Sequence, residues 1–330
     1  MNGPLVFLLL TNWTGGHSAL HPMGPQAGHI NDLWWLMFWV CAAVFVLVMV
    51  ATGFAITRRS LPSGPPGPIP PASRRRMTGA VAGAIGVTVL ILFALLIASV
   101  STGRAIASLS SSKAPVIRLT GHQWWWEVEY QDPHPDRMVL TANEIHIPAG
   151  RPVLIQLSSN DVIHSFWVPN LHGKRDLIPG HDSEIWIQAD KPGIYRGFCA
   201  EFCGYQHAHM GLLVIADPPD RFDAWYSAQL QSSVMPATPL QQRGRQLVEA
   251  SPCAVCHSIQ GTQAGGKLGP DLTHLASRRT LAAATLANNR GNLAGWILDP
   301  QTVKPGNHMP GNSLGSEDLQ AILDYLESLK

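Results

Sequence analysis

Two long apolar runs constrain the fold of this chain more than any other feature. The first covers Leu33–Thr57 and the second Met77–Gly103, and neither contains a charged residue over its 25 or 27 positions. As helices they would extend about 37–40 Å, which exceeds the ~30 Å hydrocarbon core of a bilayer. Charged residues make up only 14 % of the chain. We therefore predict a transmembrane helical hairpin over residues 33–103.

The segment between the two runs predicts the orientation of the hairpin. It reads "RRSLPSGPPGPIPPASRRR", with five arginines, no acidic residue and a proline-rich middle. Short arginine-rich loops stay in the cytoplasm, so both termini and everything after Arg104 should lie outside it. Residues 1–32 would be an extracytoplasmic segment, where "LVFLLL" is too short to span a membrane and a signal peptide is an open alternative. The formal net charge of +1 gives no basic excess for binding nucleic acid.

The composition changes twice after the hairpin, which predicts two soluble domains. From Pro115 to Ile215 the chain shows about seven short alternating runs, with "VIRLTGHQWWWEVEY" taken as a single strand. This pattern favours an all-β Greek-key domain over residues 104–231, closed by a short helix at Asp220–Gln231. The stretch "SSVMPATP" at 232–239 is a linker, and residues 240–330 predict an all-α domain.

The helical domain carries "CAVCH", the attachment motif of a c-type haem. Cys253 and Cys256 would bond the haem vinyl groups, and His257 would be the proximal iron ligand. The alternatives are a disulfide or half of a zinc site, but no second Cys/His pair is present to complete a zinc site. Met309 in "KPGNHMP" is the favoured sixth ligand, because a thioether suits an electron carrier, and His308 is its rival.

The β-domain carries "CAEFCGYQHAHM", which places two thiols, an imidazole and a thioether close together. A single blue-copper site needs one Cys, two His and a weak Met ligand, so Cys199, Cys203, His207 and Met210 offer one thiolate too many and one histidine too few. His164, at the start of an earlier strand, can supply the missing imidazole. This set predicts a two-copper centre, and a Cys199–Cys203 disulfide is the alternative in an oxidising compartment.

Both domains resemble known families. Residues 240–330 are similar to class I cytochromes c, and in "GPDL" this likeness gives the Pro270 carbonyl the role of steadying the proximal histidine. Leu33–Tyr226 resembles subunit II of the haem–copper cytochrome c oxidases through "GHQWWWEVEY", "DVIHSFWVP", "KRDLIPG" and "PGIYRGFCAEFCGYQHAHM". The resemblance implies a cupredoxin-like fold and, together with the cytochrome, an oxidase subunit to which the cytochrome is tethered.

The second resemblance also implies roles for individual residues. Cys199 and Cys203 would bridge the mixed-valence CuA centre, with His164 and His207 as terminal ligands. Its weak axial ligands would be Met210 and the backbone carbonyl of Glu201, whose side chain would reach a magnesium ion shared with the catalytic subunit. Trp124 matches the electron-entry aromatic, and three consecutive tryptophans on one strand should leave at least one exposed.

These features predict the electron-input subunit of a terminal oxidase in a bacterial inner membrane. Electrons would pass from haem c to CuA and then to a catalytic subunit I that reduces oxygen to water. The expected partners are that subunit, a subunit III, and a donor such as a cytochrome c or a bc complex. Because the chain has no oxygen-binding centre, it would be part of an enzyme. The alternatives are a CuA subunit of a nitric oxide reductase and a membrane-anchored stand-alone electron carrier.

Overall fold

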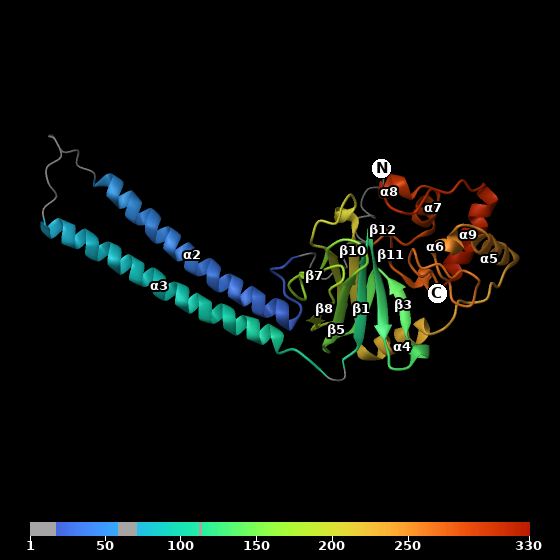
Figure 1. Ribbon diagram of the computed structural model, residues 1–330, viewed down its shortest axis with the longest axis horizontal. Coiled ribbons are helices and arrows are strands. Elements are labelled where there is room, and N and C mark those ends of the chain that lie inside the picture. The colour runs from blue at the N-terminus through green and yellow to red at the C-terminus, as the bar shows by residue number, and fades with distance from the viewer. Residues whose placement is uncertain (1–17, 59–70, 112–113) are drawn as a thin grey trace, which may run out of the picture. The chain divides into compact units, whose positions relative to one another are not determined.

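The computed structural model describes residues 18–58, 71–111 and 114–330. "LVFLLL" and the proline-rich middle of the arginine loop lie outside these described residues. The chain divides into two units, residues 28–108 on the one hand and residues 1–27 with 109–330 on the other. The predicted order of two apolar helices, a β-domain and a helical domain is confirmed (Figure 1).

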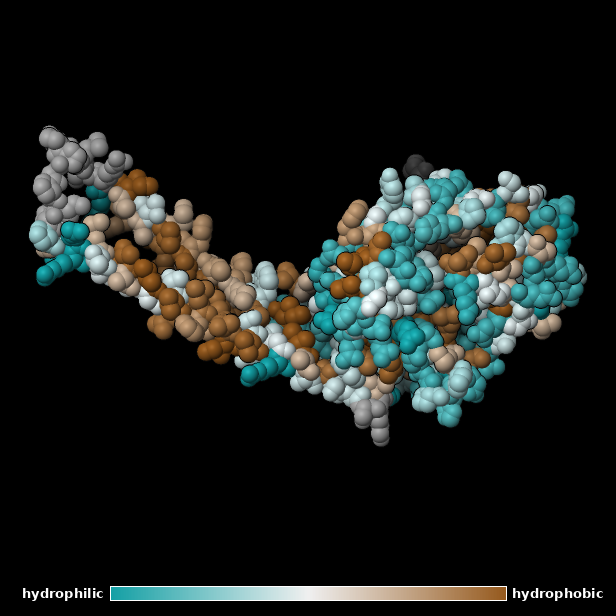
Figure 2. All heavy atoms as spheres, viewed as in Figure 1, coloured by the Kyte–Doolittle hydropathy of each residue, from teal (hydrophilic) through white to brown (hydrophobic). Residues whose placement is uncertain are grey.

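Two long helices, α2 (Pro25–Thr57) and α3 (Pro71–Ala107), contain the apolar runs. Both are long and apolar enough to cross a membrane, and Figure 2 shows hydrophobic side chains along them. Each helix begins six to eight residues before the predicted span, because the prediction followed only the uncharged run. Both start at a proline, which fits the first turn of a helix since its missing N–H has no helical partner there.

The β-domain consists of two five-stranded sheets, with strand orders β3-β2-β1-β5-β8 and β4-β10-β9-β6-β7. The strands are β1 (Val116–His122), β2 (Trp125–Gln131), β3 (Val139–Ala142), β4 (Glu144–Pro148), β5 (Val153–Ser159), β6 (His164–Trp167), β7 (Arg175–Leu177), β8 (Ser183–Ile187), β9 (Gly193–Cys199) and β10 (Gly211–Asp217). Buried residues of these strands form one apolar core, which includes Trp126, Tyr130 and Phe166. Short 3₁₀ turns lie at η1 (Pro135–Arg137) and η2 (His207–His209).

The expectation of a single strand over residues 116–130 is wrong. The segment forms a hairpin in which β1 and β2 pair antiparallel from Val116↔Gln131 to His122↔Trp125. Gln123 and Trp124 make the turn, and the Gln123 N–H donates to Asp161 Oδ2 at 2.6 Å. The turn pair contains no Gly, Pro, Asn or Asp, so the usual sequence signals of a turn are absent there.

The helical domain has its own core. Its elements are α5 (Pro239–Ala250), α6 (Cys253–Cys256), η3 (Leu275–Ser277), β11 (Thr280–Leu281), β12 (Leu286–Ala287), α7 (Arg290–Leu298), α8 (Pro300–Val303) and α9 (Ser316–Ser328). Helices α5 and α9 pack so closely that a Cβ on Gly244 would lie 2.0 Å from the Ala321 carbonyl oxygen. The apolar cluster between them is separate from that of the β-domain.

A short linker joins the two domains of this unit. It runs from the end of α4 (Pro219–Gln229) to Pro239, where α5 begins. The linker is bonded to the helical domain, because Ser233 N donates to the Gln260 carbonyl at 3.1 Å and His274 Nε2 lies 3.0 Å from the Gln231 carbonyl. The linker is therefore hydrogen-bonded to the helical domain.

Candidate copper and haem sites

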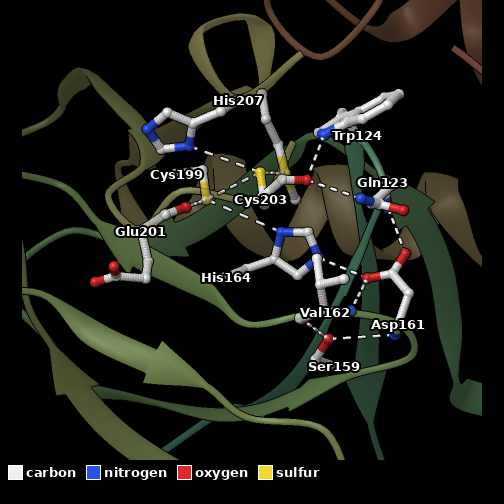
Figure 3. A network of polar contacts seen from close by, with 11 residues as sticks. Gln123, Trp124, Ser159, Asp161, Val162, His164, Cys199, Glu201, Cys203 and His207 are labelled. Carbon is white, nitrogen blue, oxygen red and sulfur yellow. Dashed lines mark hydrogen bonds and ion pairs between the residues drawn. The ribbon is translucent and has the colours of Figure 1, made fainter. Parts of the chain in front are cut away.

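Two cysteines form the centre of the first site (Figure 3). Cys199 is the last residue of β9 and Cys203 lies in the loop that follows, and both are buried. Their sulfurs are 3.7 Å apart, well beyond the ~2.05 Å of a disulfide bond, so the two thiols are free. The alternative of a Cys199–Cys203 disulfide is therefore not what the structure contains.

Two imidazoles approach this sulfur pair, one toward each cysteine. His164 Nδ1 lies 3.9 Å from Cys199 Sγ, and His207 Nδ1 lies 3.6 Å from Cys203 Sγ. Figure 3 shows the two rings reaching the sulfurs from different sides. His164 is the first residue of β6, and it is far in sequence from the cysteine loop. Strand β6 brings it there by pairing with β9, with Phe166 opposite Cys199.

Two weaker donors complete the arrangement. The Glu201 carbonyl oxygen is 3.2 Å from Cys199 Sγ, and the Met210 thioether sulfur is 3.8 Å from Cys203 Sγ. The other four predicted donors thus lie around the two sulfurs, with one imidazole and one weak donor near each sulfur. Soft sulfur ligands with imidazole suit copper, and the donor set fits a pair of copper ions better than one.

A carboxylate that sequence reasoning missed orients His164. Asp161 Oδ1 lies 2.7 Å from His164 Nε2, which keeps the proton on that nitrogen and leaves Nδ1 free to face the sulfurs. Burial opposes ionisation of Asp161, but hydrogen bonds from His164 and from two backbone N–H groups outweigh it and lower the pKa of this carboxyl. The available signal was an acidic residue three positions before a predicted ligand.

The hydrogen bond between the two thiols shifts their pKa values in opposite directions. The hydrogen bond between the sulfurs lowers the pKa of Cys199 to about 3, against the opposing effect of burial. The same bond, together with burial, raises the pKa of Cys203. Without a metal the pair thus keeps one proton at neutral pH, and a cation bound by both sulfurs would displace it.

The second site is a cavity of about 390 Å³ that is lined mostly by the helical domain, including Cys253, Cys256, His257, His308 and Met309, and is bordered by the β1–β2 turn of the β-domain. The predicted haem residues therefore line one cavity. Both candidate sixth ligands line it, and the ring of His308 also lies 5.9 Å from the ring of Trp124. The Met309 backbone is fixed at both ends, by the Asn307 side chain at 2.8 Å and the Gln301 side chain at 2.8 Å.

His257 is held as an iron ligand requires. Its Nδ1 lies 2.7 Å from the Pro270 carbonyl oxygen, the contact expected from "GPDL", so Nε2 is left for a metal. Burial lowers the pKa of this imidazole, which favours the neutral form. A Cβ on Gly269 would lie 2.6 Å from the ring, so only glycine leaves His257 room there.

A buried arginine supports the fit of a haem to this cavity. Arg278 lines it, and its Nη2 donates to the Asp271 carbonyl at 2.5 Å. Its Nε has no hydrogen-bond partner among the described residues, although buried donors are almost always paired. A propionate of haem would satisfy it. Sequence reasoning did not identify Arg278, and nothing in "SRRT" distinguishes it from its neighbour.

Trp124 contacts both sites. Its indole Nε1 donates to the Cys203 carbonyl at 2.8 Å, and the residue also lines the haem cavity. The three tryptophans do not lie on one strand, and the expectation that one of them is exposed is wrong: Trp124 lies in the β1–β2 turn and only 6 % of it is exposed, and Trp125 is half-buried. Trp126 is fully buried and Trp125 stacks on His122 at 4.4 Å.

The Glu201 carboxylate points away from the sulfur pair in Figure 3. Its side chain is 45 % exposed and lies 3.4 Å from Lys174 Nζ. A magnesium ion at this carboxylate stays a prediction.

The fold and the two sites define a class, a membrane-anchored redox subunit with a sulfur-rich metal-binding β-domain and a cytochrome domain. Residues 132–216 match the family described as cytochrome c oxidase subunit II, periplasmic domain, and residues 241–330 match cytochrome c. Cytochrome c oxidase subunit 2 of Alkalihalophilus pseudofirmus is 36 % identical over 99 % of this chain and 96 % of that protein. The chain therefore belongs to the cytochrome c oxidase subunit 2 family.

The chain is also similar to two further proteins. The subunit of the same name from Bacillus sp. strain PS3 is 33 % identical, over 74 % of this chain and 73 % of the relative. The periplasmic domain of subunit II of a Bradyrhizobium japonicum cytochrome oxidase is 28 % identical, with a TM-score of 0.34, over 37 % of this chain and 96 % of that structure.

Membership of this family carries several consequences. The chain is a subunit of a haem–copper oxidase, an oxidoreductase complex assembled in a membrane, and its two domains indicate copper and haem as cofactors. It serves electron input to that oxidase. The family names speak against the nitric oxide reductase and stand-alone carrier alternatives.

Proposed function

We propose that this subunit accepts electrons on a covalently attached haem c and passes them through a binuclear CuA centre to the catalytic subunit, where oxygen is reduced to water. Cys253 and Cys256 attach the haem, and His257 and Met309 are its axial ligands. When bound, the two groups supply one-electron oxidation and reduction. The residues of the chain hold them, exclude water and set the distance between them.

The copper part of the proposal is supported by the donor set around Cys199 and Cys203. Both sulfurs are buried on a β-scaffold, and each has one imidazole nitrogen within 4 Å. A rigid frame of this kind holds its ligands in nearly one geometry in both oxidation states. Little nuclear rearrangement is then needed when an electron arrives or leaves.

The shared position of Trp124 is the observation that carries the proposal. One residue borders the cavity that holds His257 and donates a hydrogen bond to the loop that holds Cys203. We propose that electrons pass between the two sites by way of this indole. Since Trp124 is buried, the donor of this subunit reduces the haem and does not reach the copper site directly.

Metal analysis and paramagnetic resonance on the purified complex test the copper assignment. We expect a pair of coppers per chain with an unpaired electron delocalised over both nuclei. Replacing Cys199 with serine should abolish that signal and leave the haem spectrum unchanged, because the two domains have separate cores. A single copper, or a signal localised on one nucleus, would refute the binuclear assignment.

We also propose the finer partners and the location of the chain. The two apolar helices would pack against subunit I of a bacterial inner-membrane oxidase, with subunit III nearby, and a cytochrome c or bc complex would be the donor. Glu201 would contribute to a magnesium site at the subunit I contact. Both metal domains would face the periplasm.

Thiol labelling in intact cells tests the orientation. Ser73 lies in the first turn of α3 and Ser232 in the linker, and both are exposed. A membrane-impermeant maleimide should label a Ser232→Cys variant in intact cells and a Ser73→Cys variant only after the membrane is disrupted. The opposite labelling would reverse the proposed topology.

A further inference from the structure

The contact between the β-domain and the cytochrome domain contains a buried acid that binds main chain. Glu144, the first residue of β4, is only 3 % exposed. Its Oε1 accepts from Arg279 N at 2.9 Å, from Thr280 N at 2.8 Å and from Thr280 Oγ1 at 2.9 Å. A carboxylate of the β-domain thus satisfies consecutive N–H groups of the cytochrome domain.

A buried base makes the reverse contact. Lys304 follows α8 in the cytochrome domain and is 3 % exposed. Its Nζ donates to the Trp124 carbonyl at 2.7 Å and lies 3.4 Å from the Ala282 carbonyl. Within the part of the chain that the structure describes, neither Glu144 nor Lys304 forms an ion pair with an opposite charge.

The surface between these two contacts is closely fitted. The Ala283 carbonyl accepts from Gly211 N at 3.1 Å, and the Ala284 carbonyl accepts from Arg196 Nη2 at 3.1 Å. The Ala284 side chain packs with Leu213 of β10 in a small apolar cluster. A Cβ on Gly211 would lie 3.1 Å from the Ala283 oxygen, so the two backbones approach each other directly.

Buried ionisable groups of this kind fix the relative placement of the two domains more than they strengthen the binding between them. Removing a carboxylate and an amine from water has a large free-energy cost, which only well-placed hydrogen bonds offset. In any other register of the two domains, the Glu144 oxygens and the Lys304 Nζ would lose their backbone partners. The contact therefore selects one arrangement, and that arrangement places Trp124 at the haem cavity.

We propose that Glu144 and Lys304 are positioning residues that hold the cytochrome domain in one register over Trp124, so that electron transfer between the domains needs no docking step. This inference rests on the proposed electron path through Trp124. Neither residue is a predicted ligand of copper or iron, although Lys304 borders the haem cavity. Both act through the main chain of Arg279, Thr280 and Trp124.

Amide hydrogen exchange on the complete purified complex measures the docking itself. In the parent protein the Arg279 and Thr280 amides should be strongly protected. Glu144→Gln, which keeps the shape but presents an amide, and Lys304→Met should each accelerate their exchange by on the order of tenfold or more, since hydrogen bonds to charged groups are the strong ones. Thr280→Val, which removes a single donor, gives a milder variant in case the others fold poorly.

The rate of haem oxidation by the copper site, followed after flash reduction, measures the positioning. In the parent complex it should not depend on solvent viscosity. In Glu144→Gln and Lys304→Met it should fall and become slower as glycerol is added, with the haem and copper spectra unchanged. Glu184→Gln on β8 and Lys191→Met in the β8–β9 turn change the same residue types at exposed positions and should match the parent.

Two results would overturn the proposal. One is unchanged exchange of the Arg279 and Thr280 amides in both variants. The other is faster exchange with a transfer rate that stays equal to the parent's and independent of viscosity, which would make the contact structural only. Because hydrogen exchange needs no copper, failure of the copper assignment would be visible separately from failure of the docking.

Discussion

At the scale of single residues, the two sites hold their histidines by opposite ring nitrogens. Asp161 binds Nε2 of His164 and leaves Nδ1 for the sulfur-rich site, whereas the Pro270 carbonyl binds Nδ1 of His257 and leaves Nε2 for the haem cavity. Both contacts measure 2.7 Å. In each case one oxygen atom decides which nitrogen can bind a metal.

Asp161→Asn should therefore weaken copper binding without changing a ligand. The amide cannot act as the charged acceptor for His164 Nε2–H, and loss of such a partner typically reduces metal affinity about 10–100-fold. Competition with a copper chelator measures the change. An affinity equal to that of the parent protein would show that the carboxylate does not orient His164.

Replacing Met309 and His308 in turn shows which of the two is the sixth ligand of the haem iron. Met309→Ala should lower the haem potential by on the order of 0.1 V and leave the copper content unchanged, because a thioether ligand raises the potential. His308→Ala should leave the potential nearly unchanged, since the His308 ring lies beside Trp124. Redox titration measures both, and the reverse result would assign the ligand to His308.

Lys304 predicts a pH dependence of stability. Burial lowers its pKa to about 7, and the nearby Cys203 sulfur only partly opposes this. Above pH 7 the unfolded chain binds more protons at this residue than the folded chain, so the free energy of unfolding should rise with pH, by at most about 1.4 kcal/mol per unit. Below pH 7 the effect should be constant.

Denaturant unfolding of the parent and Lys304→Met, followed at the haem absorption band, measures this effect. The difference in unfolding free energy between the two proteins should grow from pH 7 to pH 9 in favour of the parent. Parallel curves over that range would contradict the lowered pKa of Lys304.

At the scale of elements, the left-handed turn between β11 and β12 is the least usual feature of the cytochrome domain. Ala282, Ala283 and Ala284 have φ angles of 53°, 57° and 57°, a region that L-residues avoid because Cβ approaches the carbonyl oxygen. The turn persists because its carbonyls bind Gly211 and Arg196 of the β-domain.

Ala283→Gly should stabilise the cytochrome domain by about 0.5–1 kcal/mol, because glycine adopts this conformation without a Cβ clash. The Ala283 carbonyl, which makes the contact with Gly211, is kept. Thermal unfolding followed at the haem band measures the gain. A loss of stability would show that the Cβ packs favourably enough to outweigh the backbone strain.

The elements also show what the sequence could predict. The helices and most strands follow from uncharged runs and alternation, and five of the six copper-site donors lie within twelve residues of one another. Strand β7 was missed because "RDL" is charged, and the β1–β2 turn was missed because it lacks turn residues. Glu144 and Lys304 could not be predicted, since their partners are main-chain atoms of distant segments.

At the scale of the whole molecule, the described domains after the helical hairpin have separate cores and a buried polar contact. Buried contacts are screened little by salt. The rate of electron transfer between the domains should therefore change less than about twofold between low and high ionic strength. Flash reduction over a salt series measures it, and a steep decline would indicate a loose, solvent-exposed encounter.

The linker that runs along the cytochrome domain has a consequence for kinetics. It ties one haem-binding domain to each copper-binding domain. Electron transfer from the haem to the copper site is therefore first order, and its rate does not depend on the concentration of the complex. On the proposed function, a low concentration of the external electron donor would slow only the re-reduction of the haem. Each oxidase would hold one electron on its own tethered haem, available for the reduction of oxygen.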